Sequence, residues 1–231
     1  MNERAIIPFR PASASVTDQV FTSLYDAVVS LRLPPGTKVS ESEVAKQLDV
    51  SRQPVRDAFF RLSNLGFLLI RPQRATLITR ISEQAVRDAV FMRTALELAC
   101  LREAVRRATA DDVAGLRAIL REQGTALGPD DAPRFQALDE AMHKRMCAVA
   151  GHPHVWTVIL EHKAHLDRIR FLTLSGDRRQ QVLVEHGGVV DAVEAGDAAL
   201  AEARLRMHLE SVLDVLPAMQ AASPEYFEPE S

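Results

Sequence analysis

The sequence predicts a mainly α-helical protein, in which an N-terminal domain with a small β-hairpin precedes an all-helical bundle. A length of 231 residues suits two domains of ordinary size. Apolar residues recur at helical spacing along most of the chain, and β-prone segments bounded by turn residues occur only near 67–81. We therefore place the domains at 12–80 and 81–220, and we expect the acidic, proline-containing segment 221–231 to be a disordered tail.

The composition is that of a globular protein, with 47 % hydrophobic and 26 % charged residues. No apolar segment approaches the roughly 18 residues that would span a bilayer, so we expect no membrane association. Two cysteines, Cys100 and Cys147, give no disulfide framework, which favours a cytoplasmic location.

The formal net charge of −3 is unevenly distributed along the chain. Residues 1–81 contain 11 Lys and Arg against 7 Asp and Glu, a balance of +4, whereas residues 82–231 contain 17 against 24, a balance of −7. Positive charge concentrated in one domain is typical of contact with nucleic acid.

The N-terminal domain is expected to contain three helices, at 16–32, 41–48 and 52–65. Ser40 and Glu43 have the spacing of a capping box at the start of the second helix. Asp49 lies in the short turn before the third, where a small polar side chain tolerates an unusual backbone conformation. The following segment FLLIRPQRATLITRI predicts a β-hairpin around its Pro-Gln-Arg corner. A helix-turn-helix followed by a hairpin is a winged-helix arrangement.

The third helix displays two arginines on one side. Ser51 suits the N-cap and Pro54 suits the first turn, so the helix begins near Arg52. An apolar stripe is formed by Val55, Ala58, Phe59 and Leu62. Arg52 and Arg56 lie together away from this stripe. Spacing alone leaves two readings open, a solvated helix face and a surface that binds DNA.

Beyond residue 81 the pattern is helical throughout. Helices are expected at about 82–108, 110–124, 132–150, 153–174, 178–195 and 197–219, which makes an all-α bundle of six helices. Glycine, proline and serine residues separate most of these segments.

Four residues of the bundle could share a metal ion. Asp139 and His143 are one helical turn apart and can reach one ion together, while His186 and His208 lie on two other predicted helices. Three imidazoles and a carboxylate suit Zn, Ni, Mn or Fe without choosing among them. Taken singly, each histidine is better explained as a hydrogen-bonded core residue.

The segment LPPGTKVSESEVAKQLDVSRQPVRDAFFRLSNLGFLLIRPQRA resembles the DNA-binding domain of the GntR family of bacterial transcription regulators, over about residues 16–80. The resemblance implies that helix 52–65 enters the major groove, where arginine can pair with guanine. The residues that it implicates in DNA contact are Arg52 and Arg56, then Ser51, Gln53 and Ser42, and Arg71 and Arg74 on the wing. This chain has Ala75, Asp49 and Gln53 where the family often has Gly, Gly and Thr, so its operator and wing geometry can differ.

The bundle resembles the FCD ligand-binding domain of the FadR subfamily of GntR regulators, over roughly residues 84–216. The resemblance maps the metal ligands of that domain onto Asp139, His143, His186 and His208. It also implies that Arg93 binds an effector carboxylate, although Arg93 could equally form an intrahelical ion pair with Glu97. Arg168 and Arg170 are further candidates for the effector pocket.

These observations favour a one-component transcription regulator, with repression the expected mode. A homodimer would bind a palindromic DNA operator, and a small organic acid bound beside the metal would alter DNA binding. The competing hypotheses are a metal-dependent hydrolase and an architectural DNA-binding module with a purely structural metal. The hydrolase hypothesis leaves residues 16–80 without a role and finds no general base beside the ligands.

Overall fold

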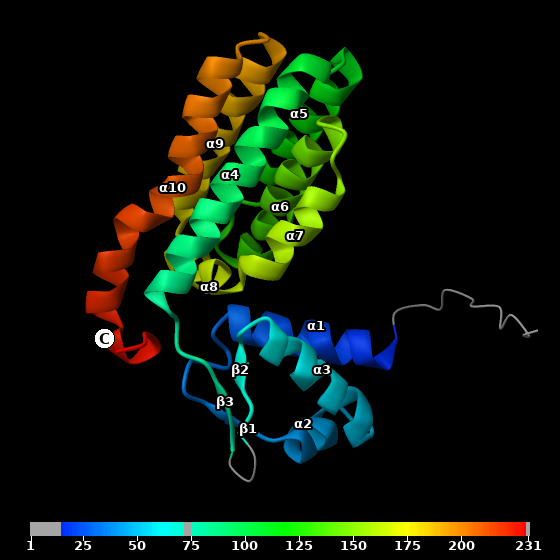
Figure 1. The fold of residues 1–231 in the computed structure, drawn as a ribbon, viewed down its shortest axis with the longest axis vertical. Helices are drawn as coiled ribbons and strands as arrows, with labels where there is room; N and C mark the ends of the chain where they lie inside the picture. The colour runs from blue at the N-terminus through cyan, green and yellow to red at the C-terminus, as the bar shows by residue number, and fades with distance from the viewer. Residues whose placement is uncertain (1–14, 72–74, 230–231) are drawn as a thin grey trace, which may run out of the picture.

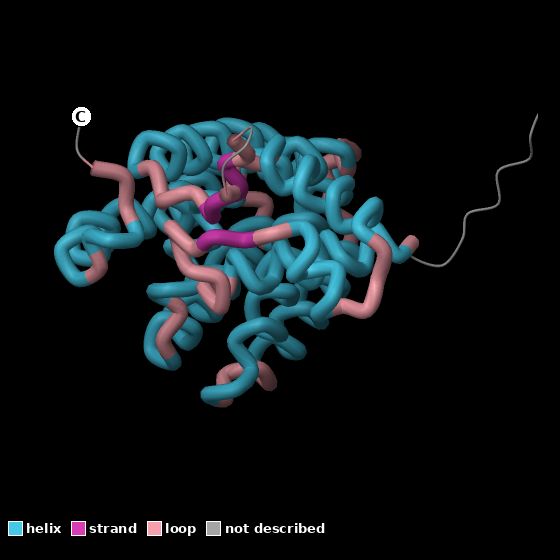
Figure 2. The backbone as a smooth tube through the Cα atoms, turned by 90° about the horizontal axis from the view of Figure 1, so that it is seen from below, coloured by secondary structure: helices cyan, strands magenta, loops and turns pink. Residues whose placement is uncertain are grey.

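The computed structural model describes residues 15–71 and 75–229. The predicted fold class is confirmed: the chain is mainly helical, and a small antiparallel sheet lies in the N-terminal domain (Figure 1). Seen from below, the strands occupy one small area and helices make up nearly all of the rest (Figure 2). Within the described residues, no helix is both long enough and apolar enough to cross a membrane.

The N-terminal domain is a helix-turn-helix with a three-stranded sheet. Its elements are α1 (Val16–Val29), β1 (Lys38–Val39), α2 (Glu41–Gln47), α3 (Arg52–Asn64), β2 (Leu68–Leu69) and β3 (Thr76–Ile78). The strand order is β1-β3-β2, with both pairs antiparallel. The hairpin was predicted, but β1 was not, because a two-residue strand has no periodicity to detect.

Local features of the helix-turn-helix follow the sequence closely. The predicted apolar stripe of α3 is buried, and Asp49 has φ +51°, which confirms the unusual backbone expected in the turn. The capping box at Ser40 and Glu43 is not formed: Ser40 occupies the N-cap of α2, but its hydroxyl lies 2.7 Å from that of Ser42.

The described part of the bundle contains seven helices instead of the six expected. They are α4 (Glu83–Arg107), α5 (Ala110–Gly124), α6 (Ala132–Val149), α7 (His154–His162), α8 (Ala164–Thr173), α9 (Gly176–Glu194) and α10 (Ala198–Ala222). The predicted helix 153–174 is two helices that meet at Lys163. The Lys163 ammonium is buried there, 2.7 Å from Glu140 and 2.5 Å from Asp167. The break coincides with these tertiary contacts. It was not predicted because the sequence has no glycine or proline at this point.

The C-terminal residues differ from the expected disordered tail. Helix α10 continues to Ala222, a 3₁₀ turn follows at Pro224–Tyr226, and Phe227 pairs with Ile81 in an isolated parallel bridge. Phe227 is buried in a cluster with α4, α8 and α10, so apolar packing holds residues up to 229 against the bundle. Residues 230 and 231 lie outside the described part of the chain.

Helix α8 joins the bundle to the N-terminal domain, lying at the base of the bundle above α1 (Figure 1). Tyr25 of α1 donates a hydrogen bond to Asp167 (3.0 Å), and Arg168 donates one to the backbone carbonyl of Thr79 (2.7 Å). The His165 ring stacks on Phe67, at 6.4 Å between centroids. Helix α8 therefore contacts both the first helix of the N-terminal domain and the residue that follows its last strand.

Gly66 is required at this boundary for two reasons. Its φ of +80° favours glycine, and a Cβ atom added there would lie 3.1 Å from Nε2 of His165. The Gly-Phe pair at residues 66–67 therefore lets the end of the helix-turn-helix approach α8 closely.

The half-buried His165 makes the domain boundary sensitive to acid. Burial, and then the neighbouring Arg168 charge, lower the pKa of His165 to about 4. The unfolded chain then binds more protons than the folded chain between about pH 6.5 and 4, so the free energy of unfolding falls as the pH drops through this window. Between pH 7 and pH 5, the free energy of unfolding should therefore fall by about 2 kcal/mol less in His165→Phe than in the unmodified protein. Urea unfolding at the two pH values measures this difference. The exposed His154→Phe is the control, and an unchanged pH dependence in His165→Phe would contradict the assignment.

Candidate functional site

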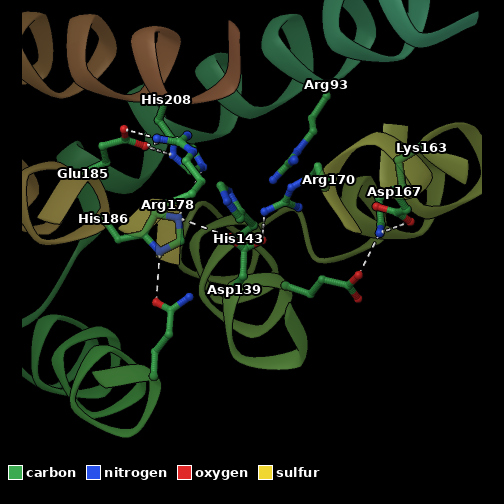
Figure 3. Close-up of polar contacts among 12 residues, drawn as sticks. Arg93, Asp139, His143, Lys163, Asp167, Arg170, Arg178, Glu185, His186 and His208 are labelled. Atoms are coloured by element: carbon green, nitrogen blue, oxygen red, sulfur yellow. Dashed lines mark hydrogen bonds and ion pairs between the residues drawn. The ribbon is translucent and has the colours of Figure 1, made fainter. Parts of the chain in front are cut away.

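The structure brings together the four residues predicted to share an ion. Asp139 and His143 come from α6, His186 from α9 and His208 from α10, and their side chains point toward one another (Figure 3). One ligand atom from each lies within 4.8 Å of the others, and all four residues are buried. This spacing allows the four to act as a single cluster.

Each imidazole is held at Nδ1 by an acceptor from another helix. His143 Nδ1 lies 2.5 Å from Glu97, and His208 Nδ1 lies 2.7 Å from Glu185. His186 Nδ1 lies 3.1 Å from the side-chain oxygen of Gln123. Because these oxygens accept, the rings carry their protons on Nδ1 and present the lone pairs of Nε2 to the centre of the cluster.

The acceptor atoms that face the centre are incompletely satisfied. His143 Nε2 makes no hydrogen bond with the residues that the structure describes. Asp139 pairs with Arg170 through Oδ2 (2.6 Å), whereas its Oδ1 makes no hydrogen bond among these residues and lies 3.6 Å from His186 Nε2. His186 Nε2 and His208 Nε2 lie 3.3 Å apart, although both Nδ1 atoms already donate their protons elsewhere. Two facing lone pairs repel, and unpaired buried acceptors are costly, so this donor set fits a cation shared by the four residues.

The protonation states of His186, His208 and Asp139 are those that favour binding of a cation. Burial is the main cause that holds the pKa of His186 well below its ordinary value, and burial lowers the pKa of His208 to about 4. Both rings are therefore neutral near pH 7, the state in which imidazole binds metals. Burial favours the neutral form of Asp139, but the positive charge of Arg170 opposes it, and the pKa of Asp139 lies well below its usual value.

The two candidate effector arginines that reach the site are Arg93 and Arg170. Arg170 lies 2.6 Å from Asp139, and Arg93 Nε lies 2.5 Å from Glu97. The predicted Arg93–Glu97 ion pair is therefore present, and Arg93 still lines a cavity of about 390 Å³ beside His208. Its Nη2 makes no hydrogen bond among the described residues, so binding of an effector carboxylate by Arg93 is compatible with the ion pair and stays a prediction.

Arg168, the third candidate, lies at the domain boundary instead of the cavity. It donates to Thr79 and His165, and its guanidinium lies 5.2 Å from the centroid of the Phe67 ring. Burial lowers the pKa of Arg168 to about 10, so it remains a cation. The expectation that Arg168 binds the effector is therefore replaced by a contact between domains.

Sequence reasoning missed two supports of the site, Gln123 and Glu185. Glu97 was recognised only as a partner of Arg93, although it also holds His143. Gln123 and Glu185 carry no motif, because their roles depend on helices α5 and α9 packing beside the histidines. The Glu185-His186 pair helped to identify His186 as a candidate ligand, but it gave no indication that Glu185 would contact His208.

The predicted DNA-contact residues of α3 form an exposed cationic surface. The side chains of Arg52 and Arg56 are 64 % and 60 % exposed, and both approach Glu41 of α2, at 3.7 and 3.4 Å. Gln53 donates to Asp57 (2.9 Å).

The other predicted DNA contacts are polar groups around α3. Within the described chain, Ser51 occupies the N-cap of α3, but its hydroxyl accepts no capping hydrogen bond from the backbone, which leaves that group available. Ser42 and Arg71 are also exposed, whereas Arg74 lies outside the described residues.

Two family models match the chain. The model for bacterial regulatory proteins of the gntR family matches residues 16–78, and the FCD domain model matches residues 88–211. Together they cover the helix-turn-helix and most of the bundle. The protein is therefore a transcription regulator with a GntR-type DNA-binding domain and an FCD domain.

Relatives agree with this class. The chain is 36 % identical over 209 residues to an HTH-type transcriptional regulator of Streptomyces ambofaciens, covering 90 % of this chain and 88 % of the relative. It is 30 % identical over 216 residues to the HTH-type transcriptional repressor RspR of Escherichia coli, covering 93 % and 95 %. The solved structure of E. coli McbR/YncC has the same fold, with a TM-score of 0.75 at 20 % identity, covering 90 % of this chain and 99 % of that one.

The chain belongs to the GntR family. Its family and relatives are transcription regulators, so the hydrolase hypothesis is set aside. The structure agrees, since the Glu140 carboxylate bonds Lys163 instead of serving as a base beside the metal ligands.

Proposed function

We propose that this GntR regulator is a repressor of the FadR subfamily type, controlled by a small carboxylic acid that binds beside a divalent transition metal. Asp139, His143, His186 and His208 hold the metal, which is Zn, Ni, Mn or Fe. The observation that carries the proposal is the shared arrangement of the three imidazoles. Each donates Nδ1–H to a fixed acceptor and turns an unprotonated Nε2 toward Asp139 and the other two rings.

The acid is expected to bind in the cavity next to the cluster. Arg93 and Arg170 supply cationic nitrogens at that end, and a bound metal would supply a further positive charge for the carboxylate. Arg170 also pairs with Asp139, so a carboxylate competes with Asp139 for this guanidinium. Binding therefore changes the contacts of α8, the helix that carries Arg170.

The response reaches DNA through α8. Along this helix, Arg170 faces the metal site, while Asp167 and Arg168 contact Tyr25 and Thr79 of the N-terminal domain. An acid that favours one position of α8 therefore favours one position of the helix-turn-helix, as linkage requires.

DNA binding is assigned to α3 and its surroundings. A homodimer would place two copies of α3 in successive major grooves of a palindromic operator. Arg52 and Arg56 are the expected base or phosphate contacts, supported by Ser51, Gln53 and Ser42, with Arg71 and Arg74 on the wing.

The metal assignment predicts a graded loss of affinity. We expect Gln123→Leu to weaken metal binding roughly 10- to 100-fold, because the ring of His186 loses its fixed acceptor. His186→Ala removes a ligand and should weaken it further. Calorimetric titration of chelator-treated protein with Zn²⁺ measures both, with the exposed His162→Ala as control. Equal metal affinity in all three variants would contradict the metal assignment and would leave the histidines with a purely structural role.

The DNA assignment predicts a specific loss at α3. We expect Arg52→Ala to weaken binding to a duplex selected from a random pool by roughly 5- to 150-fold, because one arginine–guanine pair is worth ~1–3 kcal/mol. Arg87→Ala, at an exposed position of α4, should bind as the unmodified protein does. Fluorescence anisotropy measures the affinities, and undiminished binding by Arg52→Ala would contradict the assignment.

The coupling route predicts a variant that binds but does not respond. The acid to use is the one that most raises the melting temperature of the metal-loaded protein in a screen of small carboxylic acids. This acid should change the affinity of the unmodified protein for DNA by roughly 5- to 150-fold. In Tyr25→Phe the change should shrink several-fold while acid binding persists, because the bond to Asp167 is lost.

The only other tyrosine provides the control, since Tyr226→Phe alters the C-terminal turn and leaves α1 untouched. A full DNA response in Tyr25→Phe would show that the signal travels by another route. An acid that binds without changing DNA affinity in the unmodified protein would favour the architectural module.

A further inference from the structure

The cavity beside the metal site is polar at one end and apolar along the rest. It lies between α4, α8, α9 and α10, with Arg93, Arg170 and His208 at the polar end. Its wall follows α10 from His208 to Met219, a stretch of twelve residues that rises by about 16 Å. The volume of about 390 Å³ is in the range of small-molecule sites.

The polar end offers donors for one carboxylate. Arg93 Nη2 and Arg170 Nη1 are buried and have no hydrogen-bond partner among the described residues. Arg178 also lines the cavity, but Glu185 engages both of its terminal nitrogens (2.6 and 3.2 Å), and Ser211 accepts a further bond from it (2.8 Å). The unpaired cationic donors are therefore gathered at a single point of the cavity.

Two of the three remaining hydroxyls of the cavity donate their protons within the protein. Thr173 donates to the carbonyl of Ile169 (3.0 Å), and Ser211 donates to that of His208 (2.7 Å). Ser175 accepts from the backbone N–H of Arg178 as the cap of α9, and it is exposed. A second ligand carboxylate beside Thr173 or Ser211 would therefore lose its water without gaining a donor, and the apolar part of the wall offers a ligand hydroxyl no partner.

Apolar side chains form the rest of the wall. They are Leu166, Leu174, Val182, Leu209, Val212 and Val215, together with Ala218 and Met219 in the last turns of α10. Val215 is 38 % exposed, so the cavity opens toward solvent near that end. A hydrocarbon group extending from the arginines along α10 would be covered by these residues.

We infer that the effector is an acid with a single carboxylate and an apolar body, and not a polycarboxylate or a sugar acid. The inference rests on the proposed function, since it concerns the same cavity. The carboxylate binds Arg93 and Arg170 beside the cluster, and the hydrocarbon lies against α10. Affinity then increases with chain length, by about fourfold for each methylene removed from water, until the chain reaches solvent.

Calorimetric titration of the Zn²⁺-loaded protein with butanoate, hexanoate and octanoate tests this, with citrate, gluconate and octanol for comparison. Tightening from butanoate to octanoate by at least tenfold, with weaker binding of the other three, is the expected result. Citrate or gluconate binding more tightly than octanoate would overturn the inference and leave the proposed function standing. Absence of binding by every acid would overturn both.

A substitution at the open end of the cavity tests the contribution of the hydrocarbon chain separately from that of the carboxylate. Ala218→Phe fills the cavity near Met219, so octanoate should bind at least tenfold more weakly while butanoate changes less than twofold. Ala218 is exposed, so the larger side chain is compatible with folding. Ala221→Phe, one turn further along α10, is the matched control and should alter neither affinity. Equal effects of Ala218→Phe on both acids would show that the chain does not lie along α10.

Discussion

The buried ion pair between Asp139 and Arg170 is the contact on which the arrangement of the site depends. Asp139 belongs to α6 and Arg170 to α8, and the two side chains are 2.6 Å apart in the interior of the bundle. Burying both charges is costly unless each remains compensated. Asp139 is fully buried and faces three imidazoles, so Arg170 is the cation that compensates its charge in this structure, and the pair links α8 to the cluster.

Helix α8 is short, and its charged side chains form contacts with neighbouring helices. Lys163 marks its junction with α7, and Asp167 accepts from both Lys163 and Tyr25. Ala164 packs with the apolar core of the N-terminal domain, while Leu166 and Ile169 pack with α4 and α10. One helix thus contributes to the cores of both domains, so the proposed signal from the ligand site to the helix-turn-helix has a direct packing route.

The sequence was informative wherever a feature depends on residues close together in the chain. The apolar stripe of α3, the left-handed backbone at Asp49 and most helix boundaries follow from local spacing. The grouping of Asp139 with the three histidines was also predicted, because one pair lies within a single helix and the resemblance supplied the rest.

Features that depend on distant residues were missed for a physical reason. The break at Lys163 has no glycine or proline, and it coincides with an ammonium paired between α6 and α8. The residues Gln123 and Glu185 gain their role only when α5, α9 and α10 pack together. Arg168 was assigned to the effector pocket because its helix was known but its direction was not. The C-terminal residues look disordered by composition, yet Phe227 packs against Ile81.

The most direct test of the account is X-ray absorption spectroscopy of the chelator-treated protein reloaded with one equivalent of Zn²⁺. The account predicts a first shell of nitrogen and oxygen at about 2.0–2.2 Å, with the multiple-scattering signature of three imidazoles and no sulfur. A sulfur scatterer near 2.3 Å would place Cys147 or Cys100 on the metal. That result, or a shell with fewer than two imidazoles, would contradict the claim that Asp139, His143, His186 and His208 form one metal site.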